Sequence, residues 1–273
     1  MADTTQVLHR GQLVSQGAMQ FLKLLFWRVA LAVLLWIIWQ QLANYLGPDT
    51  LPQPSDVFRR LWVITRSGEI IHMTLVTMGE VVGGLLVGGG LGIFLPFVLS
   101  LSPRATRAIE PFLKIAMGIP KLALSPIIIL WFGVGFSSKV ALIALMVFFM
   151  IFVSTFAGIR SVDGRLLLMC RILGARPVQL LKEVVWNTAL PFIFAALKTA
   201  LPWAINAAIV AEFLASEAGL GYYIHHSYNS ADTVGAFAGV VAATLIMVVI
   251  DILFVAIQAR SLLWRAVDTQ AVH

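Results

Sequence analysis

Charge is scarce in this chain, because Asp, Glu, Lys and Arg make up only 12% of its 273 residues. Soluble domains carry about 25% charged residues, so the composition excludes an ordinary soluble fold. The single cysteine, Cys170, excludes a disulfide framework and a zinc site built from cysteines. The five histidines show no metal-ligand spacing, so we expect no metal site.

A nucleotide-binding signature is also missing. The chain contains no GxxxxGK sequence followed by Ser or Thr, and no lysine follows its glycine cluster at 88–92. Such a loop is needed to cradle the phosphates of ATP. We therefore expect that the chain is not an ATPase and holds no cofactor of its own.

Hydrophobic residues dominate what is present, at 60% of the chain with a mean hydropathy of +0.92. Backbone groups in lipid need internal partners, which leaves helices or closed barrels. The apolar runs show no alternation of polar and apolar residues, which argues against a barrel. The sequence predicts an all-α membrane protein.

Six apolar runs are long enough to cross a bilayer, which takes about 20 residues each. We place them near 27–46, 71–101, 112–132, 140–159, 189–213 and 234–257. Residues 1–26 lack the pattern of a cleaved signal peptide, and we expect a cytoplasmic N-terminal segment there. A transmembrane domain at 27–258 and a cytoplasmic tail at 259–273 complete the predicted organisation.

The basic residues predict the orientation. Of the 19 Lys and Arg residues, fourteen fall on one side of the spans, and Lys198 lies inside a span. The other four fall in the connections on the opposite side, and they are Arg59, Arg60, Arg66 and Lys139. Cytoplasmic loops are enriched in Lys and Arg, so both termini should be cytoplasmic. The net charge of +6 is then a sign of topology, and no nucleic-acid partner is expected. Residues 52–69 predict a short amphipathic helix on the outer surface.

Two further patterns concern packing inside the membrane. Glycines of the second span recur at intervals of four, which permits close helix packing within one subunit or between subunits. Charged residues inside a membrane usually have a partner or a function. Lys198 and Asp251 should come to a similar depth near the inner third of the membrane, so we predict a buried ion pair between them. We expect Glu80 and Glu212 to reach water at the outer side.

The connection at 160–187 is the most informative segment. It is basic, and its apolar residues recur at helical spacing until Gly174, which predicts a short cytosolic helix that ends there. A second helix at 177–185 should lead into the membrane. Two short helices of this kind favour one of two roles. They could dock a partner protein, or they could pack against the ends of the chain's own helices.

The stretch from Arg171 to Pro191 resembles the cytoplasmic loop of ABC importer permeases. Gly174 matches the glycine of that loop, Val184 its aliphatic position after nine intervening residues, and Leu190-Pro191 a second Leu-Pro. Residues 168–170 read Leu-Met-Cys where the family has Glu-Ala-Ala, and Trp186-Asn187 stand where it has Leu-Pro.

An ordered set of short segments narrows the resemblance to the nitrate/sulfonate/taurine permease branch. The set lies between residues 51 and 223 and comprises Leu51-Pro-Gln-Pro54, Thr74-Leu75, Ile119-Pro120, Leu124-Ser-Pro126, Leu130-Trp-Phe-Gly133-Val-Gly135, Ser138-Lys139, Ala211-Glu212 and Gly219-Leu-Gly221. Glu80 stands where the resemblance leads us to expect arginine.

The resemblance implies a type I ABC importer permease fold in a bacterial inner membrane. It implies a second permease copy as partner in a homodimer, two cytosolic ATPase subunits that hold ATP and magnesium, and a periplasmic or lipid-anchored substrate-binding protein. The 160–187 segment would be the coupling loop. Its ATPase-docking residues would be Leu168, Met169, Cys170, Arg171, Leu173, Gly174, Ala175 and Arg176.

Spans three to five should line the translocation path, for which we select Ser125, Pro126, Phe148, Phe149, Asn206 and Glu212. The resemblance implies import of a small anion. A vitamin precursor, a pyrimidine or a flavin, is the alternative within the same architecture. An ion-coupled secondary transporter using Glu80, Glu212 or Asp251 is the alternative of another class.

Overall fold

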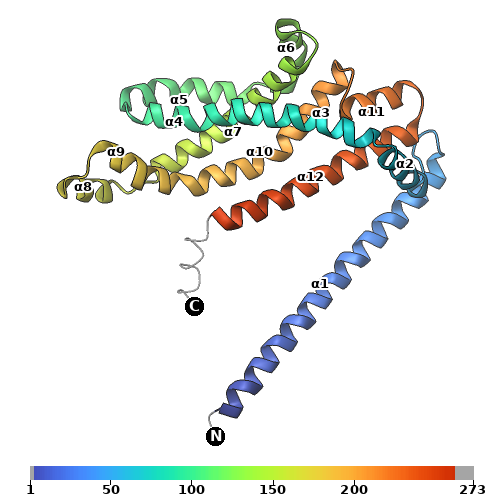
Figure 1. Cartoon of the computed structure of the whole chain (residues 1–273), viewed down its shortest axis with the longest axis horizontal. Helices are drawn as coiled ribbons and strands as arrows, with labels where there is room; N and C mark the ends of the chain where they lie inside the picture. Colours follow the sequence, from blue (N-terminus) through green and yellow to red (C-terminus); the bar gives the residue numbers. More distant parts are fainter. Residues whose placement is uncertain (1–2, 262–273) are drawn as a thin grey trace. The chain divides into compact units, whose positions relative to one another are not determined.

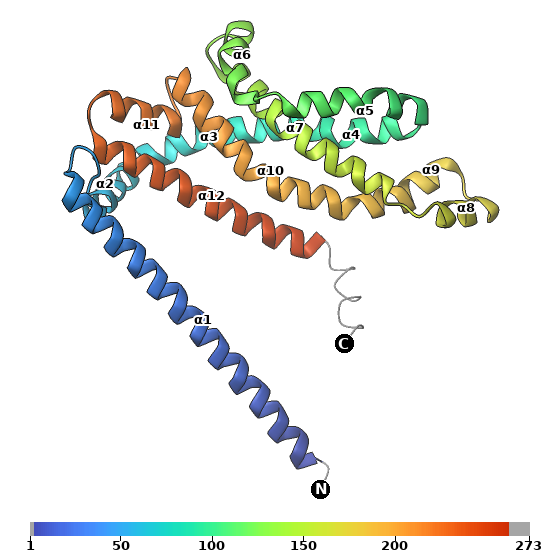
Figure 2. The ribbon, with the colours of Figure 1, turned by 180° about the vertical axis from the view of Figure 1, so that it is seen from behind.

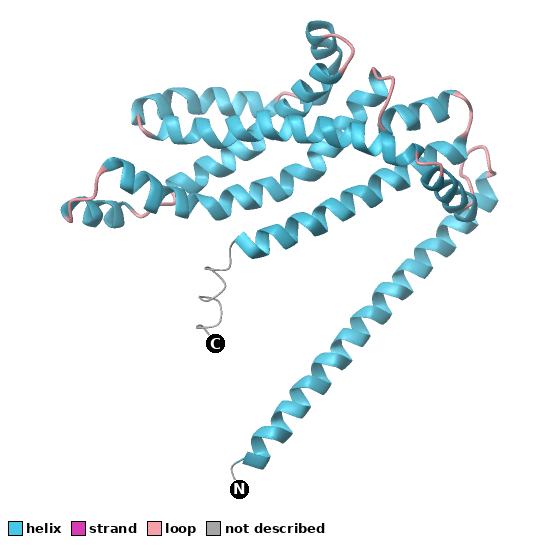
Figure 3. Ribbon diagram, in the orientation of Figure 1, coloured by secondary structure: helices cyan, strands magenta, loops and turns pink. Residues whose placement is uncertain are grey.

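The computed structural model describes residues 3–261, and residues 262–273 of the predicted C-terminal tail lie outside this range (Figure 1). Every regular element in the described part is a helix (Figure 3). In chain order the helices are α1 (Asp3–Leu46), α2 (Pro54–Arg66), α3 (Glu69–Gly84), η1 (Leu85–Gly89), α4 (Gly90–Ser100), α5 (Pro103–Gly118), η2 (Lys121–Leu124), α6 (Ser125–Phe132), α7 (Phe136–Arg160), α8 (Gly164–Ile172), α9 (Pro177–Gln179), η3 (Leu180–Val185), α10 (Trp186–Leu214), α11 (Leu220–Asn229) and α12 (Thr233–Ser261). The all-α prediction is confirmed.

The chain divides into two compact units, Met1–Arg60 and Leu61–His273. In the first unit, the indole Nε1 of Trp39 on α1 donates to the carbonyl oxygen of Pro52 at 3.1 Å. The ring of Trp36 lies 5.5 Å from that of Phe58 on α2. These contacts attach the start of α2 to the end of α1. The short helix predicted at 52–69 is present as α2.

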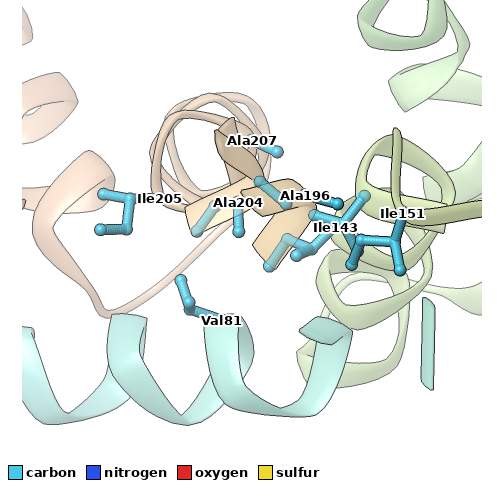
Figure 4. Packing of buried hydrophobic residues seen from close by; sticks show 10 residues of the cluster. Val81, Ile143, Ile151, Ala196, Ala204, Ile205 and Ala207 are labelled. Carbon is cyan, nitrogen blue, oxygen red and sulfur yellow. The ribbon is translucent and has the colours of Figure 1, made fainter. Parts of the chain in front are cut away.

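The second unit is built around α7 and α10, which lie side by side in both views (Figures 1 and 2). Val81 of α3, Ile143 and Ile151 of α7 and a row of alanines on α10 meet in its core (Figure 4). The small side chains let the backbones of α7 and α10 approach closely. The fully or nearly fully buried alanines of this row are Ala196, Ala200, Ala204, Ala207 and Ala208.

The glycine stripe of the second span faces α7. A Cβ atom at Gly84 or Gly88 would overlap Ile143 or the backbone of Ala144, and one at Gly92 would lie 2.9 Å from the carbonyl oxygen of Phe148. Of the two readings left open by the sequence, packing within one subunit is therefore the one that the structure supports.

Five helical stretches are long and apolar enough to cross a membrane: Lys23–Leu46, Glu69–Ser100, Phe136–Arg160, Pro177–Leu214 and Thr233–Gln258. The span predicted at 112–132 is instead broken, because Arg104–Gly118 and Lys121–Phe132 meet at a bend of 81°. Ile119 precedes Pro120 and is extended, with ψ of 129°, as expected for a residue before proline. The count of spans in the described residues is five, or six with the bent pair.

Candidate functional site

Residues 160–187, the predicted coupling loop, start at the end of α7 and contain α8. The carboxylate of Asp163 accepts a hydrogen bond from the backbone N–H of Arg165 at 2.8 Å, which caps the first turn. No residue of α8 is buried, although most of its residues are apolar. The predicted short helix is confirmed; it contacts η3 while leaving most of its side chains exposed.

Gly174 ends this helix as predicted. Its backbone adopts φ of +84°, and its N–H donates to the carbonyl oxygen of Arg171 at 3.0 Å while the N–H of Ala175 donates to that of Cys170 at 2.9 Å. This pair of bonds is a Schellman motif, which satisfies the last carbonyls of a helix and favours glycine at the left-handed position. A Cβ at Gly174 would meet nothing within 4 Å, so conformation alone selects glycine.

The chain then enters a single long helical stretch. Pro177 occupies the first position of α9, where its missing N–H costs nothing, and the N–H of Arg176 donates to Oε1 of Gln179 at 2.8 Å. The π-helical turn η3 follows and continues into α10 without a break, giving one stretch from Pro177 to Leu214. The helix predicted at 177–185 is present, and it is continuous with the membrane span α10.

The predicted docking residues are mostly exposed. The side chains of Leu168, Met169 and Leu173 are 59%, 62% and 84% exposed. Arg171, Gly174 and Arg176 are exposed too, whereas Cys170 and Ala175 are half-buried. Of these residues, Cys170, Leu173, Gly174 and Ala175 border a cavity of about 340 Å³ between the end of α8 and η3, which Glu183 and Val184 also line. An exposed apolar surface of this kind is typical of a protein contact.

A second site, which is polar, lies inside the helix bundle. We call it the buried cluster, and it consists of Thr77, Glu80, Lys139, Glu212 and Ser216. Nζ of Lys139 on α7 donates to Oε1 of Glu80 on α3 at 2.7 Å and to Oγ of Ser216 at 2.6 Å. Only 7% of the Lys139 side chain and 1% of the Glu80 side chain are exposed. An ion pair so deeply buried depends on both partners being present.

Glu212, near the end of α10, forms the other half of the buried cluster. Its Oε1 accepts from the hydroxyl of Thr77 at 2.7 Å, and its Oε2 accepts from the N–H of Gly221 at 2.7 Å. The N–H of Leu220 donates to the Thr77 hydroxyl at 3.0 Å. A carboxylate that accepts several hydrogen bonds is stabilised in place.

The buried cluster therefore joins three spans to the turn that follows α10. Ser216 lies in that turn, and Gly221 is the second residue of α11 beyond it. Gly219 has φ of +109°, and a Cβ there would overlap the carboxylate of Glu212. The turn is thus fitted closely around a charged side chain.

Two sequence predictions need correction here. Glu80 and Glu212 do not reach water, since each is only 1% exposed and is bonded within the bundle. The predicted Lys198–Asp251 pair is not formed in the described part of the chain: Lys198 is exposed, and the buried lysine that pairs with a carboxylate is Lys139, with Glu80. The sequence placed Lys139 in an outer connection and missed its role, although it follows the start of an apolar helix by only three residues.

The predicted path residues lie on several elements. Ser125 is buried and donates to the carbonyl oxygen of Leu122 at 2.7 Å, and Phe148 and Phe149 begin a row of rings along α7 that continues through Phe152 and Phe156. Pro126 and Asn206 are exposed. Glu212 belongs to the buried cluster rather than to an open surface.

One face of α10 carries exposed polar side chains inside a span. Lys198, Thr199 and Asn206 are all exposed there, and Thr199 and Asn206 are seven residues apart, which places them on one side of the helix. Thr199 also borders a cavity of about 430 Å³ between α5, α7 and α10, which Ser154 lines from α7. Polar groups in a span face a protein or water rather than lipid.

Residues 84–262 match the family described as binding-protein-dependent transport system inner membrane component. The chain is 33% identical over 86% of its length to the riboflavin transport system permease protein RibX of Chloroflexus aurantiacus, covering 88% of that protein. It is 30% identical over 84% of its length to the Bacillus subtilis permease SsuC, whose name refers to aliphatic sulfonates, covering 83% of it. A third relative is the formylaminopyrimidine transport permease protein ThiX of Halalkalibacterium halodurans, at 32% identity over 78% of this chain and 86% of that one.

Solved structures show the same fold. The chain matches one from a bacterial ABC transporter involved in the import of the acidic polysaccharide alginate with a TM-score of 0.63, covering 86% of this chain and 95% of the other at 15% identity. It matches one from an amino acid ABC transporter with a TM-score of 0.57, covering 72% of this chain and 94% of the other at 18% identity.

Proposed function

Because the chain belongs to the family of binding-protein-dependent transport system inner membrane components, we propose that it forms the translocation path of an ATP-driven importer for a small anion. ATP would be hydrolysed on two separate cytosolic subunits. A second copy of the chain would complete the path, and an external binding protein would deliver the substrate. The membrane would be the bacterial inner membrane.

The observation that carries this proposal is the continuous helical stretch Pro177–Leu214. One end bears the exposed coupling loop, and the other holds Glu212 in the buried cluster. Movement of the ATPase subunits against the loop would displace the stretch as a rigid lever. The buried cluster would then transmit that motion to α3, α7 and the turn before α11, which supports alternating access by rocking of packed helices.

The exposed face of α10 supports an anionic substrate. Lys198 lies near the middle of a span, points away from its own bundle and has no ion-pair partner among the described residues. If this face borders the path, its ammonium group offers a positive charge to a passing anion. Thr199 and Asn206 would add neutral hydrogen-bonding groups.

Import of a vitamin precursor is the second candidate. It is favoured by the similarity to permeases named for riboflavin and formylaminopyrimidine. Passage of such a substrate would not require a positive charge on the path. The ligand retained by the cognate binding protein separates the two candidates directly, because that protein selects the substrate before it reaches the membrane.

Reconstitution tests the function itself. Vesicles containing the chain together with its ATPase subunits and binding protein should accumulate the substrate when ATP is supplied. Vesicles containing the chain alone should not accumulate it, even with a proton or sodium gradient. Uphill uptake by the chain alone would refute the proposal and favour an ion-coupled secondary transporter.

A further inference from the structure

A cavity of about 930 Å³ lies where the ends of several helices meet. Ser100 and Leu101 border it at the end of α4, Arg160 at the end of α7, and Pro177 at the start of the stretch that becomes α10. Its volume is within the range of small-molecule sites, about 300–1,000 Å³.

The lining of this cavity is amphiphilic. Three arginines contribute to it from three different elements: Arg107 of α5, Arg160 of α7 and Arg171 of α8. No carboxylate is among the described residues that line it, and most of the remaining lining is aliphatic or aromatic. Three guanidinium groups around an apolar hollow match a ligand with an anionic end and an apolar end.

Arg160 is held at the rim by weak contacts. Its guanidinium lies 5.6 Å from the ring of Phe156 and 3.9 Å from a carboxylate oxygen of Glu110. Both members of that ion pair are partly exposed, at 62% and 39%, so solvent screens it and leaves most of the positive charge available.

The depth of the cavity identifies the kind of ligand. The candidate spans Glu69–Ser100 and Phe136–Arg160 both end at it, which places the cavity at the boundary between the hydrocarbon and the headgroups. The same side carries most of the Lys and Arg residues and is predicted to be cytoplasmic. Basic pockets between transmembrane helices on that side bind anionic lipid headgroups.

We propose that this cavity binds the phosphate headgroup of an anionic phospholipid from the cytoplasmic leaflet. The arginines would contact the phosphate, and the acyl chains would leave along the apolar wall that includes Leu101 and Phe156. The headgroup would bridge α5, α7 and α8, so that the lipid links the coupling loop to the ends of two spans.

The test uses the full chain in nanodiscs of phosphatidylcholine with increasing phosphatidylglycerol, and native mass spectrometry counts the retained phosphatidylglycerol. Arg107→Gln and Arg171→Gln should each lower its apparent affinity about fivefold, since a basic residue near the surface contributes about 1 kcal/mol. Matched controls are Arg104→Gln and Arg165→Gln, which lie on the same two helices, are exposed and do not line the cavity. Arg107→Lys and Arg171→Lys keep the charge and should retain most of the binding.

Four results would overturn the proposal. In the first, the variants of the lining arginines and the control variants lose phosphatidylglycerol equally. In the second, neither set of variants loses any. Inorganic phosphate at millimolar concentration could displace the lipid completely, which would make free phosphate the ligand. Addition of the ATPase subunits could release the lipid, which would assign the cavity to a protein contact. Thermal melting of each variant separates loss of binding from loss of folding.

Discussion

The coupling loop and the buried cluster lie at the two ends of one helical stretch, and their chemistry is opposite. The loop exposes Leu168, Met169 and Leu173 where no lipid is expected to cover them. The buried cluster places Glu80, Lys139 and Glu212 where little water reaches them. An exposed apolar surface depends on a partner protein, whereas buried charges depend on one another. We therefore expect the protein to stay folded when substitutions in the coupling loop abolish coupling. We expect it to lose stability when a single charge of the buried cluster is removed.

The largest expected effect is on the buried cluster. Lys139→Met leaves Glu80 buried without its counter-ion, and removal of one partner of a buried ion pair costs about 3–5 kcal/mol. We expect a large fall in the folded fraction, measured by fluorescence-detected size exclusion after heating. Lys182→Met, at an exposed position in η3, is the matched control and should be close to neutral.

The double variant Lys139→Met, Glu80→Leu sharpens this test. Replacing both partners of a buried pair by apolar groups is often nearly neutral, so the double variant should recover much of the lost stability. If it melted as low as Lys139→Met alone, the ion pair would not be the cause of the instability.

The coupling loop should respond in transport rather than in folding. Gly174→Pro cannot adopt φ of +84°, and forcing proline into an incompatible position costs about 3 kcal/mol or more. This lowers the population of the native loop about a hundredfold. In the reconstituted importer we expect ATP hydrolysis without substrate uptake. Gly174→Asn is the matched control, because asparagine tolerates the left-handed region. Normal uptake by the proline variant would refute the assignment of the loop.

Gly219→Ala tests how closely the turn fits Glu212. Alanine there combines positive φ with overlap of the Glu212 carboxylate, and we expect about 1–3 kcal/mol of destabilisation. Gly68→Ala provides the control, since Gly68 also has positive φ, at +80°, but its Cβ would meet nothing within 4 Å. Equal losses of melting temperature for the two variants would show that space around Glu212 is unimportant.

The smallest effect concerns the helix between the two regions. Lys198→Gln keeps a polar, slightly shorter side chain but removes its charge. We expect a KM for an anionic substrate about tenfold higher, with ATPase activity and folding unchanged. Thr199→Val on the same face provides a comparison without a change of charge. An unchanged KM in Lys198→Gln, with an anion confirmed on the binding protein, would remove Lys198 from the path.

Local features of the fold were predictable from the sequence. The family is confirmed, as are the all-helical fold, α8 and its end at Gly174. Each depends on neighbouring residues: the length of an apolar run, a helical spacing, or a glycine that a left-handed end requires. Pro120 was a local signal for the break in the span predicted at 112–132. The span was nevertheless placed as one continuous helix, because its apolar run is long enough to cross a bilayer.

The buried cluster could not be predicted in the same way, because its members come from positions 77 to 216 and meet only after α3, α7 and α10 have packed. Depth alone paired Lys198 with Asp251, yet depth does not determine which face of a helix a side chain occupies. Lys139 was assigned to an outer connection, since the sequence does not reveal that the turn after α10 folds back over it. Its partners follow from tertiary packing.

The π-helical turn η3 sets the angular phase between the coupling loop and α10. A π-helical turn holds one residue more than an α-helical turn, and each α-helical residue corresponds to about 100° of rotation and 1.5 Å of rise. The length of Leu180–Val185 therefore sets the rotation of α8 about the axis of α10. One residue inserted into or deleted from it would rotate α8 by roughly a quarter of a turn about that axis. The position of Glu212 would hardly change.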